Sequence, residues 1–259
     1  MCTLSKVFVF TKEYFETHIA MKEKTVSEAI NFRRSVRKYD PKKAIDTKLV
    51  KKCIEQARLA PTSSNLQLWE FYHIKSKKFL KEVAKVCYNQ PAAKTAHELV
   101  IPVVRLDLWP ERIKANVNFI KNTNKGKDDN KIKGALDYYE NIIPKLYRGR
   151  KKITGFINSI KTYLSGIKKV TYREVKASDL RVVGHKSCAL AAQTFMLSMS
   201  AVGYDTCPME GFDSVRLKSL LNLPKDAEIS MVIGCGIRQK DGLYGDRFRI
   251  PFNEVYFKK

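Results

Sequence analysis

One long apolar segment, residues 182–202, limits what this chain can fold into. It is apolar on nearly every face of a helix, and Gly203 is placed to end it. A helix that is hydrophobic all round must be covered all round, because none of its faces suits water. The cover is either the core of the domain alone, or that core on one side and a second subunit on the other.

The rest of the chain alternates helical and strand patterns. Residues 25–28, Thr-Val-Ser-Glu, have the form of a capping box and predict a helix that runs into a basic segment and ends near residues 39–41. Further patterns predict a second helix and three strands, at residues 49–59, 69–74, 99–106 and 230–237. The 259 residues, with 44% hydrophobic content, fit a single domain of the α+β class over residues 1–259.

Two short motifs carry the candidate chemistry. Arg33-Arg34-Ser35-Val36-Arg37 offers three guanidiniums and a hydroxyl, which are the donors that a phosphate group needs. Residues 60–69, Ala-Pro-Thr-Ser-Ser-Asn-Leu-Gln-Leu-Trp, form a polar, turn-prone run that ends in an aromatic residue at the start of a strand. Taken alone, the first motif also fits a solvated basic face and the second an ordinary turn. Together they indicate a flavin site.

Two later segments extend this pattern. Residues 208–211, Pro-Met-Glu-Gly, and residues 247–251, Arg-Phe-Arg-Ile-Pro, follow the first two motifs along the chain. The four resemble the nitroreductase family of FMN-dependent oxidoreductases, whose motifs are Arg-x-Ser-x-Arg/Lys, Pro-Ser-Ser-x-Asn-x-Gln-Pro-Trp, Pro-x-Glu-Gly and Lys/Arg-x-Arg-x-Pro. Thr62 replaces the first Ser of the second family motif, and Leu68 replaces its Pro. The resemblance covers residues 26–106 and 180–256.

The resemblance implies a role for each matching residue of the first motif. Arg33 and Ser35 would bind the FMN phosphate, and Arg34 would lie along the ribityl chain. Arg37 would face the pyrimidine edge, where a cation stabilises the negative charge of the reduced flavin.

The other motifs would complete the site. The second would contact the flavin from the other subunit through Pro61, Thr62, Ser63, Asn65 and Gln67. Backbone N–H groups of Glu210 and Gly211 would reach the flavin N5, an approach that glycine permits. Arg247 and Arg249 would return to the phosphate. A family contact at the pyrimidine edge has three candidates here, namely Asn89, Gln90 and Lys94.

The same resemblance implies a fold and a reaction. The family has a central mixed β-sheet flanked by helices and forms intertwined homodimers with FMN at the interface. NADH or NADPH would deliver hydride to the flavin and leave, and a nitroaromatic, quinone or activated alkene would then be reduced. Because the flavin carries the hydride chemistry, no catalytic side chain is expected.

Other site classes find little support. The six cysteines show no C-x-x-C spacing and the four histidines lie far apart, so no metal site is predicted, and the thiols are expected to be reduced and mostly buried. Phosphate-loop, zinc-protease and nucleophile-elbow motifs are absent from the sequence. The start of the chain has too short an apolar run for a secretory signal, and no stretch is long enough to span a bilayer, which favours a cytoplasmic protein.

Residues 107–180 separate the matching blocks and correspond to the region that forms a variable lid in the family. Within them, residues 141–173 hold nine Lys or Arg, no Asp or Glu, and apolar residues at helical spacing. This pattern predicts a basic amphipathic helix, which fits a lid first, then a membrane surface, and least well nucleic acid. The net charge of +23 is spread over the chain, which weakens the case for a dedicated binding patch.

Two rival functions remain open at this point. A flavin-poor, non-catalytic protein could use the basic helix 141–173 at a membrane or nucleic acid. Related families also use the same scaffold for reductive dehalogenation or flavin breakdown, and residues 107–180 do not exclude these.

Overall fold

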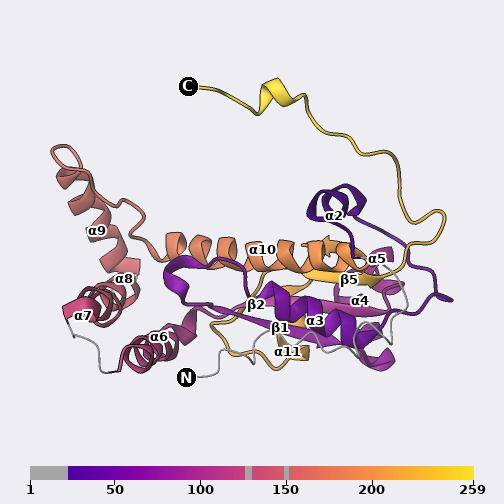
Figure 1. The fold of residues 1–259 in the computed structure, drawn as a ribbon, viewed down its shortest axis with the longest axis horizontal. Coiled ribbons are helices and arrows are strands. Elements are labelled where there is room, and N and C mark those ends of the chain that lie inside the picture. Colours follow the sequence, from indigo (N-terminus) through magenta and orange to yellow (C-terminus); the bar gives the residue numbers. More distant parts are fainter. Residues whose placement is uncertain (1–22, 126–129, 149–151) are drawn as a thin grey trace.

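A central β-sheet organises the computed structural model, which describes residues 23–125, 130–148 and 152–259 (Figure 1). The strands run in the order β1-β2-β5-β3, with β4 paired to β2. Their bounds are Trp69–Ile74 (β1), Glu98–Val104 (β2), Asp205–Met209 (β3), Glu228–Ile229 (β4) and Val232–Gly236 (β5). Pairs between these strands are antiparallel, and an isolated bridge between Ser35 and Thr206 is parallel.

Helices cover both faces of this sheet. On one face, α3 (Thr47–Ala57) and α10 (Ala177–Ala201) enclose a core with β2 and β5. On the other, α4 (Lys77–Val86) and α11 (Ser214–Leu220) pack against the same strands. The arrangement is a sheet between two helical layers, which confirms the α+β class.

Helix α10 is the predicted apolar segment, and it is longer than the sequence pattern indicated. The domain core covers one side of it, where Ala192, Phe195 and Met199 are buried. Other positions are open, since Val182 is 50% exposed and Leu190 is 48% exposed. The core of this one chain therefore does not cover the helix all round.

Helix α2 (Val26–Phe32) begins with the predicted capping box, in which Thr25 accepts from the Glu28 N–H, but it ends earlier than predicted. The expected end near residues 39–41 is wrong. Arg33 has extended backbone angles, and the N–H of Val36 donates to Thr206 O at 3.2 Å. Pairing with β3 takes residues 33–39 out of the helix, and Val36 and Tyr39 are buried in this form.

The second predicted helix and the three predicted strands are confirmed to within two residues at each end, and two strands were not predicted. Strand β3 contains Pro208, a residue that argues against a strand in sequence analysis. It is tolerated because β3 lies at the end of the strand order. Strand β4 is too short to give a sequence pattern.

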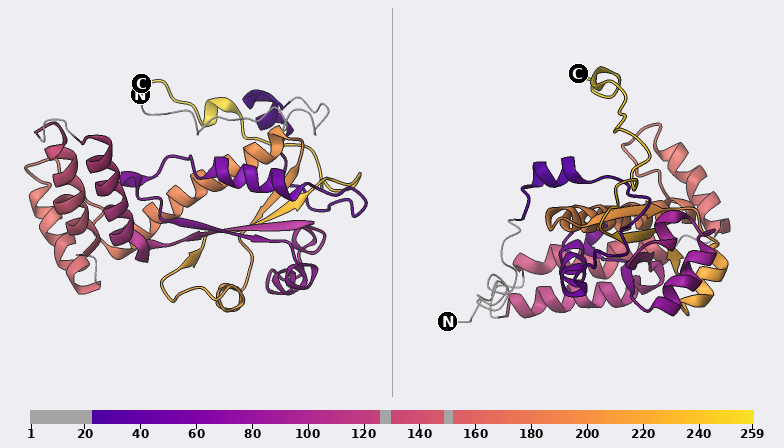
Figure 2. Two further views of the ribbon diagram at one scale, coloured as in Figure 1. Left: turned by 60° about the horizontal axis from the view of Figure 1, so that its bottom comes forward. Right: turned by 90° about the vertical axis from the view of Figure 1, so that its right-hand side faces the viewer.

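The predicted helix 141–173 is wrong as a single element. Residues 141–173 hold only part of a set of separate helices, which spans residues 107–180 and lies together at one end of the sheet (Figures 1 and 2). They are α6 (Trp109–Thr123), α7 (Asn130–Asp137), the π-helix η3 (Tyr138–Ile142), α8 (Ile143–Arg148) and α9 (Lys152–Ser165). Gly166 follows the end of α9, where glycine commonly stops a helix. We call residues 107–180 the insertion.

Apolar side chains of α9 do not pack on this chain's own domain. Phe156 is 66% exposed, Ile160 is 48% exposed and Leu164 is 59% exposed. A lid closed on its own domain would bury them.

Shorter elements complete the chain. They are η1 (Ser63–Asn65), α5 (Pro91–Lys94), η2 (Leu106–Leu108) and η4 (Phe252–Glu254). Beyond β5 the chain runs past α2 and away from the sheet, and its aromatic residues Phe248, Phe252 and Phe257 are exposed (Figure 1). None of the helices in the described ranges is long and apolar enough to cross a bilayer.

The cysteines within the described residues are reduced and buried, as predicted. Cys53, Cys87, Cys188, Cys207 and Cys235 are free and buried. Cys2 lies outside the described residues.

Candidate functional site

A cavity of about 260 Å³ joins the first and fourth sequence motifs. We call it the basic pocket. Segments 33–37 and 243–249 line it, although they are far apart in the sequence. Its charged and hydroxyl-bearing lining residues are Arg33, Arg34, Ser35, Arg37, Tyr244, Asp246, Arg247 and Arg249. The structure thus brings together the predicted phosphate ligands of both motifs.

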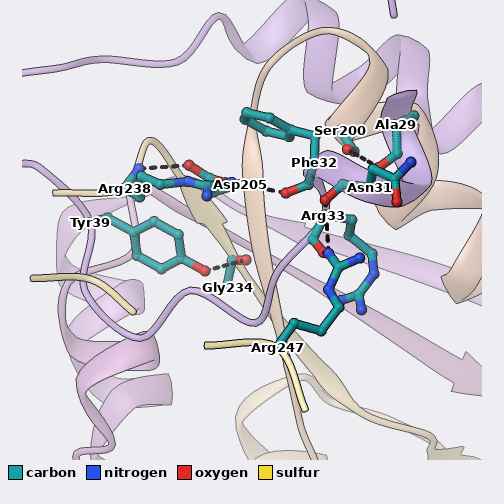
Figure 3. A network of polar contacts seen from close by, with 10 residues as sticks. All are labelled: Ala29, Asn31, Phe32, Arg33, Tyr39, Ser200, Asp205, Gly234, Arg238 and Arg247. Atoms are coloured by element: carbon teal, nitrogen blue, oxygen red, sulfur yellow. Dashed lines mark hydrogen bonds and ion pairs between the residues drawn. The ribbon is translucent and has the colours of Figure 1, made fainter. Parts of the chain in front are cut away.

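Tyr39 fixes the extended segment that carries the first motif. Its side chain is fully buried, and its hydroxyl donates to Gly234 O at 2.8 Å (Figure 3). A Cβ at Gly234 would lie 2.7 Å from Ala92 O, and one at Gly236 would lie 2.6 Å from Cδ1 of Tyr39. Gly234 therefore leaves room for the Ala92 carbonyl, and Gly236 leaves room for the Tyr39 ring.

A buried ion pair fixes the turn where α2 ends. The Arg238 N–H donates to Asp205 Oδ2 at 2.7 Å, and Arg238 Nε donates to Asp205 Oδ1 at 2.9 Å. The same guanidinium donates to Phe32 O at 3.1 Å and lies over the Phe32 ring (Figure 3). The end of α2 is thereby tied to β3, directly before the first arginine of the pocket.

Backbone carbonyls hold the two sides of the basic pocket together. Arg247 Nη2 donates to Asn31 O at 2.8 Å and to Arg33 O at 2.6 Å (Figure 3). From the other side, Arg34 Nη2 donates to Gly245 O at 2.5 Å. These contacts use part of each guanidinium, which has five N–H donors in all, and leave its charge uncompensated.

The electrostatics of the basic pocket favour an anion. Burial, together with the positive charges of Arg247, Arg249 and Arg34, lowers the pKa of Arg33. In the described part of the chain, no ion pair joins these arginines or Arg37 to a carboxylate. Such a cluster of guanidiniums favours an anion such as phosphate, which accepts charge-assisted hydrogen bonds from several of them at once.

The second motif lies elsewhere, beside the insertion and the N-terminal half of α10. The N–H of Ser63 donates to Ser187 Oγ at 3.4 Å, and the N–H of Gln67 donates to Thr62 Oγ1 at 3.2 Å. Asn65 pairs with Asn116 of α6, where its Nδ2 donates to Oδ1 at 2.9 Å. Pro61, Ser63 and Asn65 are exposed, while Thr62 and Gln67 are partly buried. Parts of the second motif are therefore exposed to solvent, while hydrogen bonds to α6 and α10 hold it in place.

Helix α10 separates the second motif from the basic pocket. Ser187 contacts the second motif, whereas Ser200 donates to Ala29 O of α2 at 2.6 Å (Figure 3). The stretch of α10 between these serines is about 20 Å long at a helical rise of 1.5 Å per residue. No residue of the second motif is among those that line the basic pocket.

The third motif lies at the end of β3, outside the lining of the basic pocket. Gln90 Nε2 donates to Gly211 O at 2.6 Å, and a Cβ at Gly211 would lie 3.1 Å from that nitrogen. Asn89 and Lys94 line a separate depression along α4. Of the three candidates for the pyrimidine edge, Gln90 is the one placed against Glu210-Gly211.

Sequence reasoning missed the residues that support the basic pocket. Tyr39, Asp205 and Arg238 have structural roles that depend on contacts between distant segments. Gly245 and its neighbours at 243–246 lie directly before the fourth motif, and that adjacency was the available signal. For Asp205 the sequence signal was weaker, namely an acidic residue at the start of a buried strand.

Comparison with known proteins adds family evidence to this geometry. The model of the Nitroreductase family matches residues 30–237. Protein DrgA of Synechocystis sp. is 27% identical over 214 residues, which are 83% of this chain and 84% of DrgA. The oxygen-insensitive NADPH nitroreductase of Helicobacter acinonychis is 23% identical over 231 residues, or 88% of this chain and 93% of that enzyme.

Solved structures share the fold. The enone reductase CLA-ER, from a gut-bacterial fatty acid saturation pathway, aligns with a TM-score of 0.67 and 18% identity over 88% of this chain and 95% of that one. A protein of Exiguobacterium sibiricum solved in complex with FMN aligns with a TM-score of 0.62 and 22% identity over 91% of this chain and 98% of that one. At these identities the likeness shows the fold alone.

Proposed function

The chain belongs to the Nitroreductase family, a family of oxidoreductases, and we propose that it binds FMN and uses NAD(P)H to reduce an electron-poor acceptor. The observation that carries this proposal is the basic pocket, where five motif arginines and Ser35 line one cavity and no ion pair joins these arginines to a carboxylate among the described residues. An FMN phosphate fits that chemistry, because its two negative charges match clustered guanidiniums.

Each part of the chain has a distinct task in this proposal. When bound, FMN supplies the hydride chemistry, so the protein's contribution is placement and electrostatics. Arg33, Ser35, Arg247 and Arg249 hold the phosphate, and Arg37 provides positive charge nearby. Gln90 orders the Glu210-Gly211 backbone through its bond to Gly211. Nitroaromatics, quinones and activated alkenes are the proposed acceptors.

We further propose that the complete site forms between two copies of the chain. The second motif and the basic pocket lie at different positions along α10, which supports a site shared by two chains. Exposed apolar residues on α10 and in the segment after β5, such as Leu190 and Phe252, provide the surface for such an interface. An isologous dimer would place each second motif against the partner's pocket.

The visible absorption spectrum of the purified protein tests the cofactor directly. We expect a flavin spectrum, release of FMN on denaturation, and bleaching when NADH or NADPH is added without oxygen. A colourless protein that also fails to take up added FMN would contradict the proposal. Salt-sensitive binding to anionic vesicles or DNA by such a protein would favour the non-catalytic alternative.

A further inference from the structure

Two consecutive tyrosines of the insertion meet one residue of the second motif. Tyr138 Oη lies 2.7 Å from Ser64 Oγ, where either hydroxyl can donate. Tyr139 Oη donates to Ser64 O at 3.0 Å. The two tyrosines begin η3, a π-helix, which is a rare element that is frequent at functional sites. The insertion therefore holds both the side chain and the backbone of Ser64.

Ser64 lies in a segment where three residues other than glycine have positive φ angles. Its φ is 53°, that of Asn65 is 49° and that of Gln67 is 49°. Such angles are unfavourable for residues other than glycine and persist when surrounding contacts impose them. Here those contacts come partly from within the motif, where the N–H of Gln67 donates to Thr62 Oγ1, and partly from the tyrosines and Asn116. Ser64 occupies a position that the family motif leaves open.

Burial alone does not account for the Tyr138 contact. Tyr138 is 37% exposed, whereas Tyr139 packs against the buried cluster that contains Leu66 and Leu68. The rings of the two tyrosines meet edge to face with centroids 5.3 Å apart. Tyr139 thus has a packing role as well, while Tyr138 reaches the second motif mainly through its hydroxyl.

We propose that Tyr138 and Ser64 form a latch between the insertion and the second motif, and that this latch holds Asn65 and Gln67 in the conformation that meets the flavin. The latch makes the insertion an active part of the site, since loosening it loosens the flavin contact and widens the range of acceptors. Tyr138 is a positioning residue in this scheme. The effect on flavin rests on the function proposed above.

A double-mutant cycle tests the latch. Tyr138→Phe, Ser64→Ala and the double variant are titrated with FMN, and kcat/KM is compared for a one-ring and a two-ring quinone. Each single change should weaken FMN binding about 2- to 10-fold, the usual range for one hydrogen bond, and the double should be no weaker than either single. The preference between the two quinones should shrink in all three. Additive losses, or an unchanged preference, would overturn the proposal.

A measurement without flavin separates the latch from the cofactor. Amide hydrogen exchange of residues 62–67 in the flavin-free protein should speed up in Tyr138→Phe. The matched control is Tyr163→Phe, which removes the same hydroxyl from an exposed tyrosine of α9 and should leave exchange and selectivity unchanged. Equal exchange in wild type and Tyr138→Phe would refute the latch. Absence of FMN from the wild type would instead refute the proposed function, and exchange would still decide the latch.

Discussion

The basic pocket and the second motif are held in different ways. In the basic pocket, arginine side chains bond to backbone carbonyls around a cavity, and among the described residues no ion pair joins them to a carboxylate. In the second motif, side chains of α6, α10 and η3 form hydrogen bonds with a strained backbone. The first arrangement suits an anion, which needs charge more than an exact shape. The second suits the recognition of a shape, which needs a fixed backbone.

The largest expected effect is the loss of FMN affinity when two arginines of the basic pocket are removed. Arg33→Ala combined with Arg249→Ala should weaken FMN binding at least about 100-fold, because each charge-assisted hydrogen bond contributes about 1.5–3 kcal/mol. Fluorescence titration with FMN measures this loss. Lys168→Ala with Lys169→Ala removes two charges from the exposed segment after α9 and should bind FMN like the wild type. Full flavin retention in the arginine variant would exclude the phosphate assignment.

A mixing experiment tests whether the two regions meet between copies. The first partner is the Arg33→Ala and Arg249→Ala variant. The second carries Asn65→Gly and Gln67→Gly, because glycine keeps the positive φ while losing the side chain. Each should be inactive alone, and subunit exchange should restore activity, since a mixed dimer has one intact site. No recovery, with exchange shown by mass spectrometry, would mean that both motifs act within one chain.

Replacing glycine by alanine at two positions compares the packing beside the basic pocket with the packing in the insertion. Gly234→Ala beside the basic pocket should lower the free energy of unfolding by about 3 kcal/mol, because its Cβ would lie 2.7 Å from Ala92 O. Gly134→Ala in α7 of the insertion meets nothing within 4 Å and should stabilise by up to about 1 kcal/mol. Urea unfolding measures both. Equal effects would show that packing at the pocket is less tight than described.

The smallest expected effect is a pH dependence at the start of the insertion. Hydrogen bonds from Arg105 hold the pKa of Asp107 below its ordinary value of 3.8. The unfolded chain therefore takes up this proton first, so the stabilisation is complete above about pH 4 and is lost as the pH falls further. Solvent screening keeps it under about 1 kcal/mol.

Asp107→Asn should thus flatten the acid side of the stability profile, followed by urea unfolding between pH 7 and pH 3. Glu55→Gln, at an exposed carboxylate of α3, is the control and should leave the profile nearly unchanged. An unchanged profile in Asp107→Asn would show that the ion pair with Arg105 contributes nothing to stability.

Local patterns in the sequence determined most elements and all four motifs. Strand β1, helix α3 and the capping box of α2 follow from periodicity and capping, which depend on neighbouring residues. The motif order identified the family, because chemistry at a phosphate requires particular residue types. These are properties of short segments, so one sequence contains them.

Only the tertiary structure decided where the elements end and which motifs meet. Helix α2 stops at Phe32 because Val36 pairs with β3, which is distant in the sequence. The same packing joins Arg33 to Arg247 while α10 keeps the second motif apart, and it places Tyr138 on Ser64. Such contacts stabilise the protein only when distant segments fold together, so they cannot be predicted from the pattern of a short segment.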